Sequence, residues 1–479
     1  MTTADLSTPS GRRLPRPTLP SEPLGRRRPW RLLVLGCFAL AALSLIVIAQ
    51  PTYDPWAWLI WGRDIVHFDL VTQSGPSWKP LPVMFTTPFA LFGDDAAPSL
   101  WLVVARAGGL LALAMAFRLA ARLSGTAAGI IAAVSLACAE LFASFAVRGN
   151  SEGLLVGLAL WAVERHLDRR YRDAFLLGVA CALLRPETWP FVALYGLWLV
   201  AAHRDGPRTA RTAALVGGAG VLVAVLWFVP EYIGSGNLFR AASRALEPVP
   251  DSPAQAEHPF LAVFTNSASA LWVPAYVGGV LAVLLALAGQ LERGARAVVL
   301  ALAAASTTLM VTVAVLAEIG FTGNLRYVAL PASLVCVLAG VGWAEAVRFV
   351  RRRAGARVGV AVAALLVVAA VPFALHTASG LGDQMDQMRA EGDVARQLPL
   401  AIERAGGERA VLRCGTVKSG PFETQLVAWH LHLHQYQVGL LPNPPATLFA
   451  LRGGALAEAP GFRTVAATKR WLVRTACAG

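Results

Sequence analysis

Charged side chains that could perform acid–base chemistry on an anionic substrate recur where long apolar runs of this sequence end. Asp54 follows the apolar run at 32–50, and Lys79 follows Trp78. The other members of this set are Arg106, Arg148, Glu152, Arg185, Glu187, Glu231, Arg326 and Tyr327. Arginine and lysine bind phosphate, whereas a carboxylate kept ionised beside such cations can remove a proton from a hydroxyl. The mixture indicates an anionic lipid headgroup and a hydroxyl group as the two reacting partners.

Each of these residues also has a simpler interpretation. Asp54 followed by Pro55 is typical of a helix N-cap and first turn, and Glu152 after "RGNS" could open a helix. The stretch "LLRPETWP" at 183–190 could be a polar hairpin, and the pair at 326–327 could anchor a span at the interface. The shared position at the edge of the hydrocarbon favours a functional site, because ionisable groups there are expensive to keep.

The composition identifies the class of protein that positions these groups. Of 479 residues, 56% are hydrophobic and only 15% are charged, which predicts an α-helical polytopic membrane protein. The net charge of +13 lies in short segments between apolar runs, as the positive-inside rule expects, so we expect no nucleic-acid partner. The phosphate-binding motif G-x-x-x-x-G-K-[ST] is absent from the sequence, which disfavours a nucleotide-driven enzyme.

The apolar runs predict eleven spans, with a cytoplasmic N-terminus and an extracytoplasmic C-terminus, in the cytoplasmic (plasma) membrane. The predicted spans are 32–50, 100–122, 126–147, 152–168, 173–185, 188–203, 211–230, 264–290, 297–317, 327–347 and 357–376. They form a transmembrane domain at 31–376, preceded by a disordered cytoplasmic tail at 1–30. A long first outer loop at 51–99 contains juxtamembrane helices, and we expect its tryptophans 56, 58, 61 and 78 to anchor it in the membrane interface.

The polar C-terminal region, 377–479, predicts a small extracytoplasmic α/β domain. After a helical stretch at 383–405, strand-like runs occupy 409–414, 424–441, 462–468 and 470–477. His430, His432 and His434 would share one face of a strand, as a metal site or as a solvated surface. Outside the cytoplasm, Cys414 and Cys477 could form a disulfide, the alternative being two free thiols. The cysteines lack metal-type spacing, so we expect no cofactor, although Mg²⁺ or Mn²⁺ is compatible with the sequence.

The first outer loop and the following span resemble the membrane glycosyltransferases of the GT-C superfamily, near the aminoarabinose and protein-mannosyl transferases. The residues that carry the resemblance are "YDPWAWLIWGRDIV", "WKPLPVMFTTPFALFG" and "LWLVVARAGGLLALAMAFRLAARLSG". In that family an acid follows the first span, a lysine–proline motif leads to "LFG", and an arginine opens the next span. "RGNSEGLLVGLAL" and "LRYVALPASLVCVLAG" resemble later family segments. This chain departs from the pattern by having one acid, at 54, and Lys-Pro-Leu-Pro after Trp78.

The resemblance implies an inverting transfer of a sugar from a polyprenyl-phosphate donor to a hydroxyl of a glycan, lipid or protein, at the outer membrane face. Asp54 would be the general base, while Lys79, Arg106 and Arg326 would bind the donor phosphate. Glu152 would position the sugar or acceptor, as would Arg148, Arg185, Glu187, Glu231 and Tyr327. Two alternatives remain: a transporter or flippase of lipid-linked sugars, which would place polar groups near the midplane, or a catalytically inactive relative.

Overall fold

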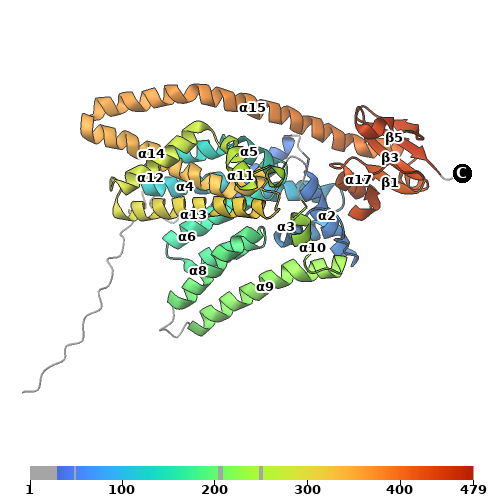
Figure 1. The fold of residues 1–479 in the computed structure, drawn as a ribbon, viewed down its shortest axis with the longest axis horizontal. Coiled ribbons are helices and arrows are strands. Elements are labelled where there is room, and N and C mark those ends of the chain that lie inside the picture. The colour runs from blue at the N-terminus through green and yellow to red at the C-terminus, as the bar shows by residue number, and fades with distance from the viewer. Residues whose placement is uncertain (1–29, 48–49, 203–208, 248–251, 478–479) are drawn as a thin grey trace, which may run out of the picture.

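A bundle of long helices carries a small sheet-containing unit at one end (Figure 1). The computed structural model describes residues 30–47, 50–202, 209–247 and 252–477, so the tail predicted at 1–30 lies outside the described residues except for its last position. The bundle elements are α1 (Trp30–Leu43), η1 (Ser44–Ile46), α2 (Tyr53–Val66), α3 (Pro80–Ala90), α4 (Ala96–Ala137), α5 (Glu140–Val147), α6 (Glu152–Leu167), α7 (Tyr171–Ala182), η2 (Pro186–Thr188), α8 (Trp189–Ala202), α9 (Thr209–Ser235), α10 (Arg240–Ala245), η3 (Pro253–Gln255), α11 (Pro259–Ser267), η4 (Ala268–Ala270), α12 (Val273–Leu287), α13 (Arg293–Glu318), η5 (Leu325–Val328), α14 (Ala329–Ala354) and α15 (Ala356–Arg404).

Several of these helices are long and apolar enough to cross a membrane. Among the described residues, five qualify, namely α4, α9, α13, α15 and the continuous segment formed by η5 and α14. A sixth is obtained if α11–η4 and α12, which meet at a bend of 108°, are taken as one span. The chain is therefore a multi-pass membrane protein. The predicted number of eleven spans is not confirmed, because α1, α6, α7 and α8 have only 12–16 residues.

Two of the predicted span boundaries differ from the structure. The spans expected at 100–122 and 126–147 form one helix, α4, that changes direction at Ser124 and Gly125, followed by the separate short helix α5. The span expected at 264–290 is broken, because Trp272 is extended and a new helix, α12, begins at Val273 with Pro274 in its first turn. Proline cannot continue a preceding helix, since it lacks the N–H donor and clashes with the previous turn.

The centre of the bundle is α14, which packs against α4 and α12 over most of its length. A Cβ atom added at Gly340 would lie 2.2 Å from the carbonyl oxygen of Ala128, and one at Gly342 would lie 1.9 Å from that of Gly278. Glycine is therefore required at both positions, because the helix backbones approach more closely than any side chain allows. This close packing fixes the depth and rotation of the segment that begins with η5.

The first outer loop folds into the protein. The helices α2 and α3 pack against each other, and Trp56, Trp58, Trp61 and Trp78 are all buried. The prediction that these tryptophans anchor the loop in the membrane interface was therefore wrong: they form a core between the loop, α4 and the C-terminal unit. The N-cap of α2 is Thr52, so Asp54 lies in the first helical turn and is not the N-cap itself.

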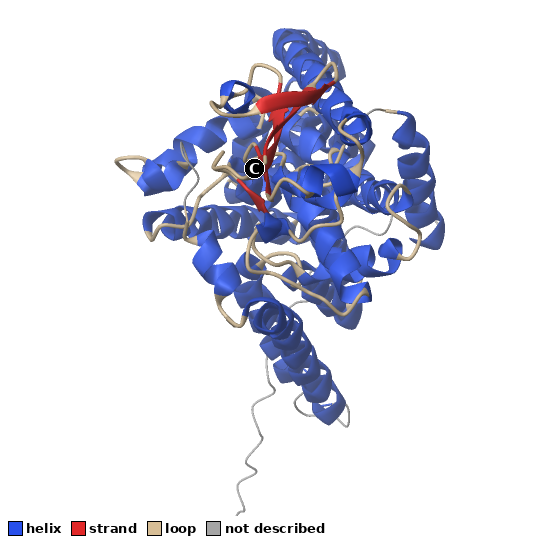
Figure 2. Ribbon diagram, turned by 90° about the vertical axis from the view of Figure 1, so that its right-hand side faces the viewer, coloured by secondary structure: helices blue, strands red, loops and turns tan. Residues whose placement is uncertain are grey.

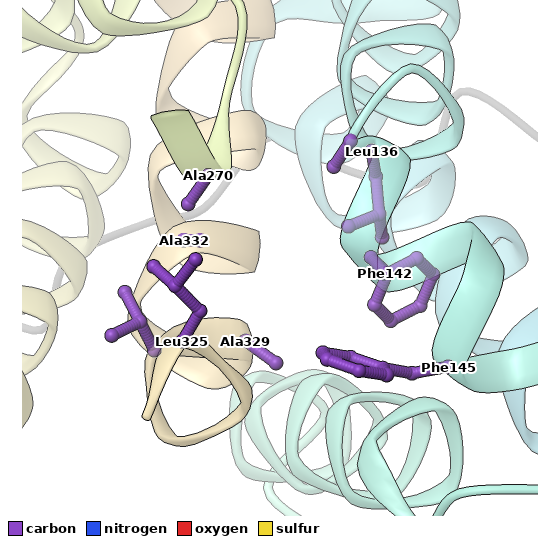
Figure 3. A pocket seen from close by; sticks show the side chains of 9 residues that line it. Leu136, Phe142, Phe145, Ala270, Leu325, Ala329 and Ala332 are labelled. Atoms are coloured by element: carbon purple, nitrogen blue, oxygen red, sulfur yellow. The ribbon is translucent and has the colours of Figure 1, made fainter. Parts of the chain in front are cut away.

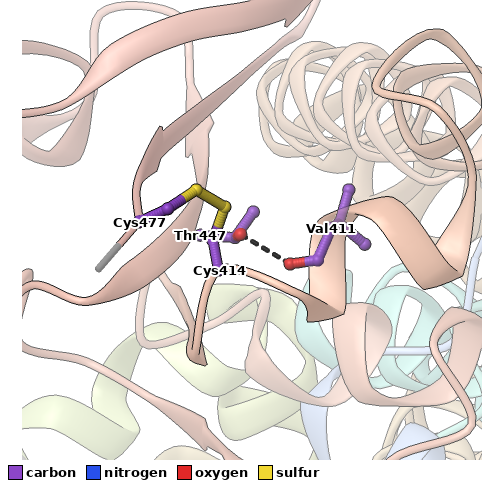
Figure 4. The surroundings of a disulfide bond; sticks show 4 residues. All are labelled: Val411, Cys414, Thr447 and Cys477. Carbon is purple, nitrogen blue, oxygen red and sulfur yellow. Dashed lines mark hydrogen bonds between the residues drawn. A yellow bond between two sulfur atoms is a disulfide. The ribbon is translucent and has the colours of Figure 1, made fainter. Parts of the chain in front are cut away.

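The C-terminal unit contains a five-stranded mixed sheet with strand order β2-β1-β3-β5-β4. Its strands and helices are α16 (Glu408–Leu412), β1 (Thr416–Ser419), α17 (Thr424–His430), η6 (Gln435–Gln437), β2 (Val438–Gly439), β3 (Ala446–Leu451), η7 (Ala455–Glu458), β4 (Arg463–Ala467) and β5 (Trp471–Ala476). Figure 2 shows the strands in front of the helical body, at the end of the molecule that faces the viewer. Cys414 and Cys477 form a disulfide beside the bond that Thr447 donates to the carbonyl oxygen of Val411 (Figure 4).

Two of the predicted strands are helices. The run at 409–414 lies mainly in α16, and the run at 424–441 forms α17 and η6 before the short strand β2. The three histidines do not share a strand face, because His430 ends α17 and His432 has a positive φ of 50°. The boundary predicted at 377 falls inside α15, a continuous helix of 49 residues that runs from the bundle into the C-terminal unit.

Candidate active site

The carboxylate of Asp54 is buried among cations from distant parts of the chain. Its Oδ2 atom lies 2.6 Å from Nη1 of Arg326 and 4.0 Å from Nζ of Lys79. Burial alone would raise the pKa of Asp54, but Arg326, Lys79 and Arg185 outweigh it and hold the pKa below its usual range. The first turn of α2 also favours a negative charge at this position. Asp54 is therefore an ionised carboxylate.

Lys79, the second cation beside this carboxylate, is the N-cap residue of α3. Its Nζ donates a hydrogen bond to Ser151 Oγ at 3.3 Å and lies 5.1 Å from the centre of the Trp58 ring. Burial, reinforced by the positive charge of Arg185, lowers the pKa of Lys79 to about 7. A lysine with this pKa changes charge within the physiological pH range.

A second layer of charges connects these groups. Arg185, which precedes η2, forms an ion pair with Glu152 at the start of α6, and its guanidinium carbon lies 4.5 Å from the centre of the Tyr327 ring. Its Nη1 lies 4.0 Å from Glu187 Oε1. The other face of this cluster is formed by Arg326, whose guanidinium is 5.4 Å from the same tyrosine ring. The Tyr327 ring thus contacts two guanidinium groups, whose mutual repulsion is offset by the carboxylates paired with each of them.

The apolar side of η5 faces away from these charges. Leu325 and Ala329 line a small apolar cavity, across from Phe142 and Phe145 (Figure 3). The segment is therefore amphipathic: its apolar side chains border the bundle interior, and Arg326 reaches the carboxylate on α2. This packing explains how a residue 272 positions away in sequence comes to lie beside Asp54.

A much larger cavity, of about 1030 Å³, lies between α6, α7, α8, α13 and α14. Most of its lining is apolar. Thr188 belongs to the lining and donates a hydrogen bond of 2.8 Å to the carbonyl oxygen of Arg185, so one end of the cavity adjoins the charged cluster. His166, near the end of α6, and Arg169, in the turn before α7, also border the cavity. The cavity therefore extends along the whole length of α7 and beside the second half of α6.

The structure brings together seven of the ten residues that the sequence singled out. These are Asp54, Lys79, Glu152, Arg185, Glu187, Arg326 and Tyr327. The other three make different contacts. Arg106 donates to the carbonyl oxygens of Ser44 and Val147, at 2.6 and 3.0 Å, Arg148 pairs with Glu391 at 2.5 Å, and Glu231 pairs with Arg240 at 3.5 Å.

Sequence reasoning missed Ser151 and Trp58, which contact Lys79, and Arg240. Ser151 directly precedes Glu152 in "RGNSEG", so its neighbour could have drawn attention to it. No group of histidine, cysteine and acidic side chains within the described residues could hold a metal ion. His432 contacts Asp94 at 2.8 Å, and His434 contacts Asp64 at 3.1 Å, so both histidines join the C-terminal unit to the first outer loop.

Comparison with known proteins defines the class of fold. No protein-family model matches the chain, and no curated protein matches its sequence. The helical bundle with its buried first outer loop and small C-terminal sheet nevertheless has the fold of the GT-C membrane glycosyltransferases, as the resemblance of the outer loop implied.

The structures that match include those of ArnT, an aminoarabinose transferase, from Cupriavidus metallidurans. The apo state matches with a TM-score of 0.56 and 16% identity, and the state bound to undecaprenyl phosphate with 0.54 and 14%. Each match covers 94% of this chain and 98% of ArnT. An oligosaccharyltransferase from Archaeoglobus fulgidus, tethered to an acceptor peptide, matches with 0.45 and 13% over 88% of this chain and 65% of its own.

Proposed function

We propose that this protein is an inverting glycosyltransferase that moves a sugar from a polyprenyl-phosphate-linked donor to a hydroxyl acceptor at the outer face of the membrane. The observation that carries the proposal is the buried, ionised carboxylate of Asp54, with Arg326 at 2.6 Å and Lys79 at 4.0 Å. A base beside two cations suits a reaction in which a hydroxyl loses a proton while a phosphate leaves.

In this reaction the acceptor oxygen attacks the anomeric carbon and its proton passes to Asp54. The new carbon–oxygen bond forms as the bond from the sugar to the phosphate oxygen breaks, and the electron pair leaves with the polyprenyl phosphate. Both cations contact Oδ2, and within the described residues Oδ1 has no hydrogen-bond donor, so Oδ1 is the atom assigned to the acceptor hydroxyl. A single displacement from the face opposite the phosphate inverts the configuration.

Lys79 and Arg326 would hold the phosphate, since negative charge accumulates there as the bond to the sugar breaks. Fixed cations in a site without bulk water stabilise such developing charge more strongly than water does. The ion pair of Glu152 with Arg185 would position the sugar or the acceptor. The large apolar cavity that reaches Thr188 supports a lipid-linked donor, because it offers an isoprenoid chain a path beside the charged cluster. ArnT, which has the same fold, binds undecaprenyl phosphate.

The outer-face location rests on the distribution of charge at the other end of the bundle. Arg118 pairs with Glu164 at 2.7 Å, and Arg122 pairs with Asp168 at 2.5 Å, just before the change of direction in α4 and at the end of α6. These arginines fit the positive-inside rule. The opposite end then faces outward with the active site and the C-terminal unit, where a disulfide between Cys414 and Cys477 is chemically reasonable.

The test compares membranes that contain the wild type, Asp54→Asn or the control Asp383→Asn, which changes an exposed acid on α15. Each is given a panel of radiolabelled polyprenyl-phosphate sugars, and label is followed into lipid, glycan and protein. We expect transfer by the wild type and the control, and a loss of about 10²–10⁴-fold in Asp54→Asn. Equal transfer by all three would contradict the proposal. Label that crosses the membrane without transfer, equally in all three, would favour a transporter.

A further inference from the structure

The segment immediately before Lys79 is attached to helices that do not themselves contact the Asp54 carboxylate. We call residues 72–78, which connect α2 to α3, the strap. At its start, the backbone N–H of Thr72 donates to the carbonyl oxygen of Gly234 at 3.0 Å, and at its end the indole N–H of Trp78 donates to that of Leu226 at 2.9 Å. Both acceptors belong to α9.

Arg240, the first residue of α10, holds the middle of the strap. Its Nη1 donates to the carbonyl oxygen of Pro76 at 2.7 Å, and its Nη2 to that of Gly75 at 2.9 Å. The hydroxyl of Ser77 donates to the carbonyl oxygen of Ala241 at 3.0 Å. A guanidinium spans two adjacent carbonyl groups with two fixed N–H donors, which the single ammonium of a lysine cannot do with the same geometry.

Glu231 balances the charge of Arg240. Its side chain is fully buried in α9, its Oε1 lies 3.5 Å from Nη1 of Arg240, and the backbone of Trp78 lies next to the same carboxylate. A buried guanidinium without a counter-ion would be strongly unfavourable, so neither member of the pair can be removed without disturbing the other. The strap therefore depends on both residues.

We infer that the Glu231–Arg240 pair positions Lys79 for the proposed reaction. Lys79 directly follows the strap and is fixed on its other side by the rigid helix α3, so the strap sets where its backbone lies. The ammonium must then reach Ser151 and the Asp54 carboxylate from that backbone position. A displacement of about 1 Å at a reacting group can cost on the order of 10²-fold in rate. The Glu231–Arg240 pair, which we call the clamp, can therefore control the site through the backbone of the strap.

This inference rests on the proposed function, but one of its consequences is measurable without any transfer. Lys79 is buried against Trp58 and bonded to Ser151, which protects its amine from reagents. If the clamp holds it there, Arg240→Lys and Glu231→Gln will expose it. Competitive acetylation of the full-length protein in detergent with acetic anhydride at several pH values, followed by mass spectrometry of the peptide that contains Lys79, gives the reactivity of its unprotonated amine. This reactivity reports exposure separately from the pKa of Lys79, which should itself return toward 10.5 when the amine is exposed.

The matched control is Arg474→Lys. Arg474 also holds backbone carbonyl oxygens, those of Ala457 and Ala459 at 2.8 and 2.9 Å, but it lies in the C-terminal sheet, away from the strap. We expect the reactivity of the unprotonated Lys79 amine to rise about fivefold or more in both clamp variants and to stay at the wild-type level in Arg474→Lys. Unchanged amine reactivity in a clamp variant that elutes as a folded protein would overturn the inference, and the second variant serves if the first does not fold.

A second measurement separates this inference from the proposed function. Binding of undecaprenyl phosphate to the purified protein should weaken about tenfold in both clamp variants, with the donor KM rising more than kcat falls. Wild-type protein that neither binds undecaprenyl phosphate nor transfers sugar would refute the proposed function. The acetylation result would still show whether the Glu231–Arg240 pair holds Lys79 in place. Binding and transfer by the clamp variants at wild-type levels would refute the positioning role alone.

Discussion

Lys79 should give the reaction a pH dependence that can be calculated from its surroundings. Its pKa lies near 7, below the ordinary value of 10.5, because it is buried and because Arg185 repels its charge. Lys79 therefore carries its positive charge below pH 7 and loses it above. Since only the charged form can hold the donor phosphate, kcat/KM for the donor should be constant at acidic pH and fall tenfold per pH unit above about pH 7.

The expected magnitude follows from the fraction of Lys79 that is protonated. A group with a pKa of about 7 is roughly 90% protonated at pH 6 and about 1% protonated at pH 9, so kcat/KM should fall by about two orders of magnitude between them. Asp54 does not contribute to the pH dependence of kcat/KM in this interval, because its lowered pKa keeps it ionised throughout. The donor phosphodiester also keeps a constant charge. The profile above pH 6 should therefore show a single basic limb.

The assay measures initial rates of transfer at low donor concentration from pH 6 to pH 9, with wild type and Lys79→Arg. Arginine stays protonated over this range, so the variant should be slower at pH 6, because its guanidinium fits the site less well, and its profile should be flat. Lys79→Met should be slow and flat. A basic limb that persists in Lys79→Arg would refute the reasoning, since some other group would then be titrating.

Three further predictions concern the site and its support. Arg326→Met should lower kcat/KM by about 10²–10³-fold in the transfer assay, because it removes the cation nearest the base; an unchanged rate would exclude Arg326 from the reaction. Cys414→Ser should destabilise the C-terminal unit by about 4 kcal/mol, because Cys477 lies 63 positions away and the disulfide closes a long loop. Urea unfolding followed by tryptophan fluorescence measures this loss. The same unfolding midpoint for the wild type with and without reductant would contradict it. Gly340→Leu should lower the thermal unfolding midpoint and the yield of folded protein, because even a Cβ atom would lie 2.2 Å from the carbonyl oxygen of Ala128. An unfolding midpoint and a yield equal to those of the wild type would mean that α14 and α4 can move apart.

The sequence predicted the central residues of the site better than its full membership. Alternating basic ends and apolar lengths place Asp54, Lys79 and Arg326 at one level of the membrane, and the structure joins them. The same level also contains Arg106 and Arg148, which bind elsewhere. The end of a span fixes how deep a residue lies but not the direction in which it points, since that direction depends on the rotation of each helix and on its neighbours.

The C-terminal unit was harder to predict for a different reason. The alternation of histidine and leucine from His430 to His434 has the period of a strand, but α17 ends at His430 and the chain turns at His432, where φ is 50°. The preceding residues form a helix that is buried between the sheet and α2, so polarity does not mark its faces. Arg63 of α2 stabilises this arrangement by donating to the carbonyl oxygens of Trp429 and Leu433, at 3.2 and 2.8 Å. Arg63 and Trp429 are 366 positions apart, so no local sequence pattern indicates that they are in contact.

The single helix α15 acts as a spacer that sets both the distance of the sheet from the bundle and its rotation about the helix axis. Its 49 residues rise about 73 Å, well beyond the ~30 Å of a membrane's hydrocarbon, so the helix sets how far the sheet lies from the point where α15 follows α14. Each residue inserted near position 383 would lift the sheet by about 1.5 Å and turn it by about 100°. Two inserted residues would turn it away from α2, whereas seven would lift it about 10 Å with nearly the original facing. Helix length and helical phase together therefore decide whether the sheet meets the outer loop.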